Sequence, residues 1–160
     1  MFERIVVPLD GSRLSAQALP CATELAHRFN SKIMLVRVIP ETTVAYLPQP
    51  RSVGSALAVD IISEQVHIKD VENAANAKRY LMNRAKELRD QNINVSYHVM
   101  EGAPVPLIIE FSIEQDASLI VMMSHGRGRF KGAILGSVTD ALIRGGSVPV
   151  LVIRARDMER

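Results

Sequence analysis

A glycine-rich basic loop between a strand and a helix is the part of this sequence best suited to chemistry. The apolar run Leu119 to Met122 leads into Ser124-His125-Gly126-Arg127-Gly128-Arg129, and Gly136-Ser137-Val138 opens a helical segment. Glycines let backbone amides approach an anion closely, and a helix N-terminus adds unpaired N–H groups with a partial positive charge. The pattern predicts a phosphate-binding loop. A plain basic surface loop, followed by a capping box of Ser137 and Asp140, would look the same.

The spacing of this loop differs from the common nucleotide-binding motifs. No Gly-Lys-Ser or Gly-Lys-Thr follows Gly128 or Gly132 at the Walker A spacing, which disfavours a P-loop triphosphatase. The glycine motif of a dinucleotide-binding fold belongs after the first strand, where this sequence offers only Gly11. Both of these classes are therefore disfavoured.

A carboxylate is expected beside the glycine-rich loop. The first apolar run ends in Pro8-Leu9-Asp10-Gly11-Ser12, and in an open parallel sheet the ends of strands one and four should meet at the crevice. Asp10 can accept hydrogen bonds from ribose hydroxyls or an exocyclic amine, or it can cap the first helix. Magnesium held against phosphates by this one carboxylate would be weakly bound.

No catalytic set accompanies the predicted binding loop. His125 is the one histidine near it, without a Cys–His pair, paired glutamates or His-x-x-x-His spacing. The other histidines, His27, His67 and His98, lie far apart along the sequence. This favours binding over fast catalysis.

Composition limits the class of protein. The 160 residues suffice for one buried core, so a single domain over 1–160 is expected. Nineteen basic and seventeen acidic residues nearly balance, and there is no Trp to stack on bases, which disfavours nucleic acid as a partner. One cysteine, Cys21, allows no disulfide within the chain. The absence of a signal peptide or an apolar stretch long enough for a bilayer predicts a cytoplasmic protein with no membrane partner.

Short apolar runs alternate with segments of helical period, which predicts an α/β fold with an open parallel sheet covered by helices on both faces. The expected strands are Ile5 to Pro8, Lys32 to Ile39, Val95 to Met100, Leu119 to Met122 and Val148 to Ile153. Helical periodicity spans Leu14 to Phe29, Ala74 to about Asp90, Pro104 to Glu114 and Ser137 to Arg144. Pro20 predicts a kink within the first of these helices.

A long segment after the second strand, from Pro40 to about Asp60, has three prolines and no clear period. Loops of this length usually carry function or move. A lid over a ligand, a contact with a partner chain and an idle insertion are all compatible with its sequence.

The strand-end segment at Val6 to Ser12, the strand Leu35 to Ile39 and the Ser124 to Val138 loop together resemble the universal stress protein family, and the resemblance covers essentially the whole chain. It implies a five-stranded parallel sheet in the order 3-2-1-4-5, Rossmann-like, and commonly a homodimer formed through the last strand, here Val148 to Ile153. Many members of the family bind ATP.

The family's ATP-binding branch is similar at Gly126, the nine residues that follow it, and Gly136-Ser137. The resemblance implies that these residues hold phosphates, that Asp10 lies near ribose and adenine, and that the backbone of Val38 reads adenine. The full set of residues expected at the nucleotide is Pro8, Asp10, Ser12, Val38, Met122, Met123, His125, Gly126, Arg127, Gly128, Arg129, Gly136, Ser137 and Val138.

Met123 departs from that pattern because it occupies the place of the first motif glycine. Its side chain could crowd the phosphates, or it could point away and leave its backbone available. Three hypotheses follow: a stress-response protein that binds ATP as a signal or stabiliser, a nucleotide-free dimeric interaction module, and a slow ATPase or phosphotransfer protein supported by His125 and the loop cations.

Overall fold

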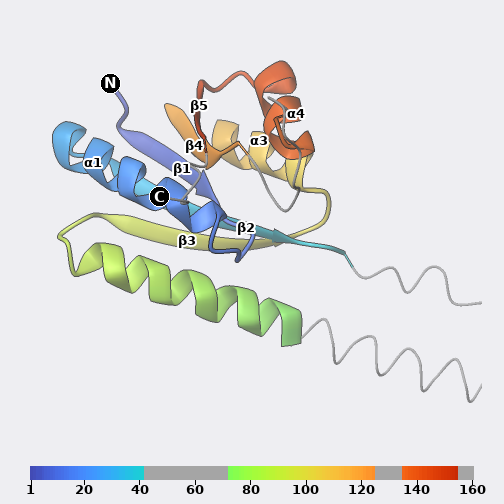
Figure 1. Cartoon of the computed structure of the whole chain (residues 1–160), viewed down its shortest axis with the longest axis horizontal. Helices are drawn as coiled ribbons and strands as arrows, with labels where there is room; N and C mark the ends of the chain where they lie inside the picture. The colour runs from blue at the N-terminus through green and yellow to red at the C-terminus, as the bar shows by residue number, and fades with distance from the viewer. Residues whose placement is uncertain (42–71, 125–134, 155–160) are drawn as a thin grey trace, which may run out of the picture.

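Five parallel strands form one sheet in the computed structural model, which describes residues 1–41, 72–124 and 135–154. The sheet order is β3-β2-β1-β4-β5 (Figure 1), and every neighbouring pair is parallel. The strands are β1 (Arg4–Pro8), β2 (Lys32–Ile39), β3 (Val95–Glu101), β4 (Leu119–Met123) and β5 (Val150–Ile153). The predicted fold class and strand order are confirmed. Of the five strands, β5 departs most from its expected start, because it begins only after Pro149, which has no N–H for the ladder.

Helices cover both faces of the sheet. The described helical elements are the short 3₁₀ helix η1 (Ser15–Ala18), α1 (Leu19–Phe29), a helix over residues 72–89 drawn in green in Figure 1, α3 (Pro104–Glu114) and α4 (Ser137–Gly145). Side chains of α1 and of the 72–89 helix share one core cluster, and side chains of α3 and α4 share the other. The chain is therefore a three-layer α/β structure.

Alternation along the central strand sends successive side chains into these two clusters. Ile5 and Val7 pack under α1 and the 72–89 helix with Ile33, Leu35 and Leu81. Val6 packs on the opposite face with Met34, Ile120 and Leu142. Because the middle of β1 and all of β4 are buried on both faces, Ile5 to Val7 and Leu119–Met123 are consecutive apolar residues, whereas the edge strand β5 is only partly buried.

Pro20 does not kink a helix, contrary to the expectation from its position in the apolar stripe. The stripe is divided between η1 and α1, and Pro20 lies in the first turn of α1. A proline is tolerated there because the first N–H groups of a helix have no intrahelical partner. The apolar spacing of three and four residues runs through both η1 and α1, because residues three apart share a face in a 3₁₀ helix as well as in an α-helix.

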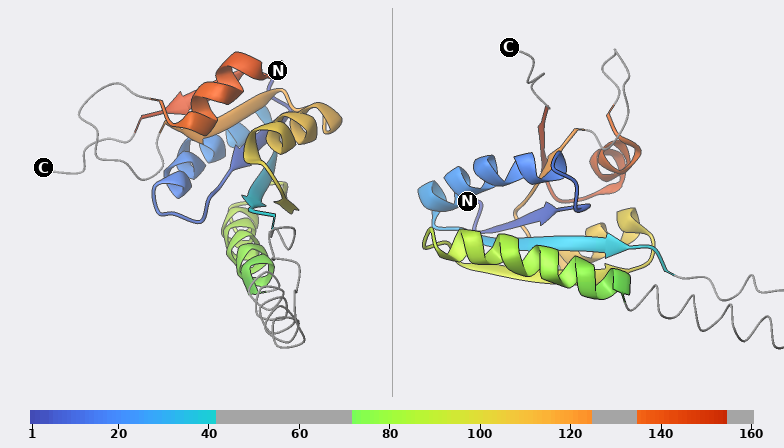
Figure 2. Two further views of the ribbon diagram at one scale, coloured as in Figure 1. Left: turned by 90° about the vertical axis from the view of Figure 1, so that its right-hand side faces the viewer. Right: turned by 60° about the horizontal axis from the view of Figure 1, so that its bottom comes forward.

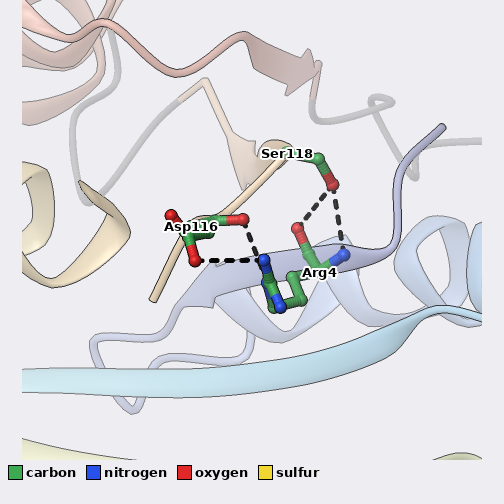
Figure 3. Close-up of polar contacts among 3 residues, drawn as sticks. All are labelled: Arg4, Asp116 and Ser118. Atoms are coloured by element: carbon green, nitrogen blue, oxygen red, sulfur yellow. Dashed lines mark hydrogen bonds and ion pairs between the residues drawn. The ribbon is translucent and has the colours of Figure 1, made fainter. Parts of the chain in front are cut away.

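The amino end of the sheet is fastened by a polar cluster around Arg4, shown in Figure 3. The Oγ atom of Ser118 accepts a hydrogen bond from the Arg4 amide at 3.1 Å and donates one to the Arg4 carbonyl at 2.9 Å. The Arg4 side chain also donates to the Asp116 carbonyl at 3.1 Å and pairs with its carboxylate at 3.2 Å. These contacts join the start of β1 to the turn before β4, at the edge opposite the predicted binding loop.

Two further expectations concern the long segment after the second strand and the membrane. The segment from Pro40 to about Asp60 lies almost entirely outside the described residues, since 42–71 are not described. Among the helices of the described ranges, none has the length and apolar character needed to cross a membrane.

Adjacent residues of the 72–89 helix provide a test of the packing. Leu81 is fully buried in the core under that helix, whereas Met82 is 45% exposed. We expect Leu81→Ala to lower the free energy of unfolding by about 2–5 kcal/mol, because it removes buried methyl groups and leaves a cavity. Met82→Ala should change it by less than about 0.5 kcal/mol. Urea denaturation of both variants checks this, and equal losses would contradict the assignment of the buried face.

Candidate functional site

At the carboxyl edge of the sheet, β1 stops pairing with β4 before β4 ends, and open α/β sheets place their crevice at this switch point. The left view of Figure 2 turns this edge toward the reader. The described pairing of β1 with β4 ends at Val6 and Ile120, although β4 continues to Met123. The Leu9 amide donates a hydrogen bond to the Val36 carbonyl of β2 at 2.8 Å. Because successive residues of a strand direct their amides to opposite sides, the backbone nitrogen of Pro8 faces β4. Pro8 has no amide hydrogen to give there, which accounts for the end of the ladder.

The backbone of Val38 faces the same crevice. The register of β1 with β2 ends where Pro8 lies opposite Val36, while β2 runs on to Ile39. Alternate residues of a strand direct their amide and carbonyl groups to the same side, so those of Val38 point as those of Val36 do, toward β1. Among the described strands, none pairs with Val38 on that side. Its N–H and C=O are therefore placed to pair with a planar polar ring.

Asp10 forms a hydrogen-bonded turn immediately after β1, and it does not cap a helix as the alternative expectation held. Its Oδ1 accepts a hydrogen bond from the Ser12 amide at 2.8 Å. The Ser12 Oγ atom accepts a hydrogen bond from the Ser15 amide at 3.0 Å. The N-cap of η1 is Leu14, without a side-chain cap bond. Asp10 lies four positions before Leu14, so its side chain is too early in the chain to cap this helix.

The environment of Asp10 favours its charged form. Partial burial by itself would raise the pKa of the Asp10 carboxyl, but hydrogen bonds with the side chains of Ser12 and Ser15 and with the Ser12 amide outweigh it, and the pKa is lowered from 3.8. Asp10 is therefore a carboxylate at neutral pH. An exposed carboxylate at the crevice accepts hydrogen bonds from hydroxyl or amine groups of a ligand.

The start of α4 is attached directly to the end of β4. The Gly136 amide donates to the Ser124 carbonyl at 2.8 Å, and the Thr139 hydroxyl donates to the Met123 carbonyl at 3.2 Å. The first backbone hydrogen bond of the helix runs from Asp140 to Gly136 at 2.8 Å. These bonds position the helix N-terminus next to the carboxyl end of β4, in agreement with the sequence-based order of strand, loop and helix.

α4 begins at Ser137 as expected, and the capping box of the alternative interpretation is not formed. Gly136 is the N-cap residue and Ser137 the first helical residue, and no described side chain caps the helix. The amides of Ser137, Val138 and Thr139 precede the first backbone hydrogen bond, as the leading amides of any helix do. Their partial positive charge is thus available to an anion at the end of β4.

Met122 and Met123 point to opposite faces of the sheet. Met123 is 5% exposed and packs in the cluster beneath α1 and the 72–89 helix, while Met122 packs beneath α3 and α4. The long side chain of Met123 is therefore accommodated in the core. Its buried position shows how a methionine fits where the resemblance expects a glycine.

The described ranges contain nine of the residues expected at a nucleotide. Pro8, Asp10, Ser12 and Val38 lie at the ends of β1 and β2, and Met122, Met123, Gly136, Ser137 and Val138 lie at the end of β4 and the start of α4. The other five, His125, Gly126, Arg127, Gly128 and Arg129, fall within 125–134, outside the described residues. Sequence reasoning missed Arg37, which lies against Gly11, and Thr139.

The described residues hold no second site of obvious chemistry. No group of three or more His, Cys, Asp or Glu side chains in these ranges is arranged to hold a metal ion. A groove of about 420 Å³ runs between α1 and the 72–89 helix, and its lining includes Leu19, Thr23, Arg84 and Glu87. None of the residues expected at a nucleotide lines this groove.

A parallel α/β sheet with a crevice at its switch point and a helix N-terminus beside it is typical of nucleotide-binding folds. The chain belongs to the universal stress protein family, whose family model matches residues 1–154.

Named relatives and solved structures agree with this family. Universal stress protein MJ0531 of Methanocaldococcus jannaschii is 27% identical over 96% of this chain and 83% of its own length. Universal stress protein MJ0577 of the same organism is 26% identical over 98% of both chains. A solved structure of MJ0577 superposes with a TM-score of 0.79 at 25% identity, covering 98% of this chain and 99% of that one. A universal stress protein solved in complex with cAMP covers 96% of this chain and 97% of its own at a TM-score of 0.61 and 22% identity, which supports the fold.

The turn at Asp10 predicts a pH dependence. Because the folded pKa lies below 3.8, the carboxylate contributes stability that is fully present above pH 3.8 and is lost as the pH falls through the folded pKa. Titration followed by NMR should give Asp10 a pKa below 3.8 in the wild-type protein. Ser12→Ala, which removes a hydroxyl that lowers it, should bring the value back up. An Asp10 pKa at or above 3.8 in the wild type would contradict the described turn.

Proposed function

We propose that this protein binds an adenine nucleotide, ATP, at the carboxyl edge of its sheet and uses it as a signal or as a stabiliser of the fold in a stress response. The observation that carries the proposal is the crevice between β1 and its neighbours, with the Asp10 carboxylate, the Val38 backbone and the start of α4 around it. The proposal places the protein in the cytoplasm, as a single domain over residues 1–160.

Each side of the crevice suits a different part of the nucleotide. The N–H and C=O groups of Val38 offer one donor and one acceptor to an adenine edge, and this pairing would select adenine over guanine because the donors and acceptors of guanine are reversed. Asp10 offers a charged acceptor to ribose hydroxyls. The amides of Ser137 and Val138 and the Ser137 hydroxyl offer donors to phosphates.

The loop between β4 and α4 would complete the phosphate site. In the proposal His125, Gly126, Arg127, Gly128 and Arg129 follow the chain's own order from the end of β4 toward Gly136, and their glycines and cations suit a polyphosphate. Magnesium would accompany ATP through its phosphates, with the protein supplying few ligands of its own. Catalysis is not required by this set of groups, and any hydrolysis would be slow.

Support from the relatives is of two kinds. The universal stress protein family model matches residues 1–154, and this region includes all the residues around the crevice. One solved member is described as a complex with cAMP, which is also an adenine nucleotide. Both observations favour a nucleotide of this base without fixing the number of phosphates.

A second candidate function, a dimeric interaction module, is favoured by the edge strand β5. This strand pairs with β4 on one side, and Leu151 within it is 37% exposed. A half-exposed apolar strand at a sheet edge is suited to pairing with another chain. We propose a homodimer formed through Val148 to Ile153, along the free side of β5, which β4 separates from β1.

Gly136→Val tests nucleotide binding. Gly136 has φ −58° and ψ 150°, a conformation open to other residues, so the substitution should leave the fold intact. A branched side chain at the helix N-cap would block the approach of phosphates to the amides of Ser137 and Val138. We expect at least a tenfold loss of ATP affinity by calorimetry with little change in the far-UV circular dichroism.

The matched control is Gly145→Ala, at the other end of the same helix. A Cβ added there would meet the Ile109 Cδ1 atom at 3.8 Å, an ordinary contact. Its ATP affinity should equal that of the wild type. Unchanged affinity in Gly136→Val, with binding intact in the control, would argue strongly against the proposed phosphate site.

Val152→Pro tests the dimer. The carbonyls of Pro149 and Ile153 accept hydrogen bonds from the Ile120 and Ser124 amides, so the alternate residues Val150 and Val152 direct their backbone groups outward. A proline at Val152 removes an outward N–H without touching the bonds to β4. We expect a monomer by sedimentation velocity, whereas Val152→Ala, which keeps the N–H, should remain dimeric. A dimer in both variants would place the interface elsewhere.

A further inference from the structure

Arg37 makes a close, flat contact with the turn that carries Asp10. Gly11 has φ +83°, and a Cβ built on it would lie 2.8 Å from Nη1, 2.9 Å from Cζ and 3.0 Å from Nη2 of Arg37. Three atoms of one planar group at nearly the same distance from one point mean that the guanidinium presents its face to Gly11. Only glycine leaves room for this contact and also adopts the positive φ without strain.

The same guanidinium also contacts an aromatic ring. The Arg37 Cζ atom lies 5.5 Å from the centre of the Tyr80 ring, on the 72–89 helix, within the range of a cation–π contact. Arg37 belongs to β2, one residue before Val38. A single side chain therefore connects a rigid strand, a helix and the turn after β1.

The turn depends on this contact because it has few other attachments to the body of the protein. Its hydrogen bonds at Asp10 and Ser12 are made within the turn itself, to Ser12 and Ser15. The Leu9 amide joins its first residue to β2. Beyond Leu9, among the described residues, the Arg37 guanidinium reaches the Gly11 backbone from another element.

We propose that Arg37 is a positioning residue of the nucleotide site, which fixes the Asp10-Gly11-Ser12 turn against β2 and so sets the direction of the Asp10 carboxylate. This inference rests on the proposed nucleotide function and adds a residue to it. Arg37 acts through Asp10 and does not touch the nucleotide. Its effect is consequently exerted on the ribose and adenine end of the ligand and is independent of the number of phosphates.

Calorimetry of Arg37→Met with ATP and with AMP tests the proposal. Methionine keeps a straight apolar stem but removes the flat cation. We expect both affinities to fall by at least fivefold and by the same factor. In an Asp10→Asn background the further change Arg37→Met should have no effect on ATP affinity, because its action passes through the carboxylate.

Two control variants separate positioning from charge and from general stability. Arg84→Met removes another cation that lies 5.5 Å from the Tyr80 ring and is paired with Glu87, and it should bind both nucleotides as the wild type does. Arg37→Lys keeps the charge without the flat group, and it should lose affinity as Arg37→Met does. Circular dichroism establishes that each variant is folded, and Arg37→Lys carries the test if Arg37→Met is not.

Several results would overturn the assignment. A loss for ATP without a loss for AMP would mean that Arg37 contacts phosphates directly, and wild-type affinity in Arg37→Lys would mean that its charge alone matters. An undiminished effect of Arg37→Met in the Asp10→Asn background would remove the link to the carboxylate. Unchanged affinities in Arg37→Met would remove any role at the site.

Hydrogen exchange without ligand separates this inference from the proposed function. If the wild-type protein binds no adenine nucleotide, the proposed function fails, and the turn can still be examined. Arg37→Met should then raise amide exchange at Asp10 to Ala16 by at least threefold, with exchange in α3 unchanged. Equal exchange in the variant and the wild type would show that Arg37 does not hold the turn.

Discussion

Pro8 sets the geometry on which the proposed site depends, because it brings no amide hydrogen to the central strand. The position of its missing N–H faces β4, and the described β1–β4 pairing ends two residues earlier, at Val6 and Ile120. The neighbouring strands continue, which leaves the Val38 backbone on one side of a crevice and the end of β4 on the other. The helices on either side of the central strand cover opposite faces of the sheet, so this crevice lies at its switch point.

The rest of the structure keeps the two walls of that crevice in place. Buried apolar clusters on both faces of the sheet fix the strands, and the Arg4, Asp116 and Ser118 contacts close its opposite edge. At the crevice itself, hydrogen bonds from Gly136 and Thr139 fasten the start of α4 to β4. Rigid strands therefore support the proposed site, whose groups are mainly backbone amides and one carboxylate, an arrangement better suited to binding than to rapid catalysis.

The fold could be predicted from the sequence because its signals are local and repeated. Continuous apolar runs such as Ile5 to Pro8 and Leu119 to Met122 identify buried parallel strands, and the three- and four-residue spacing of Ala77, Leu81 and Leu88 identifies a helix face. Signals that depend on one residue were less reliable. Pro20 lies in the first turn of α1 rather than inside a helix, because η1 divides the apolar stripe. The helix at Ser137 starts as predicted, without the capping box that Ser137 and Asp140 could have formed. Arg37 was not predicted because its partners Gly11 and Tyr80 are distant in sequence and come together only across β2. The residues of the loop at 125–134 remain predictions, as does the part of Asp10 and Val38 in binding.

The most direct test of the account is a calorimetric titration of nucleotide-stripped protein with ATP and magnesium, with AMP and GTP as controls. The account predicts saturable binding of ATP with one site per chain, weaker binding of AMP through the same adenine contacts, and no measurable binding of GTP. Absence of heat, together with an unchanged melting temperature at millimolar ATP, would contradict nucleotide binding and leave the dimeric interaction module as the function that the fold supports.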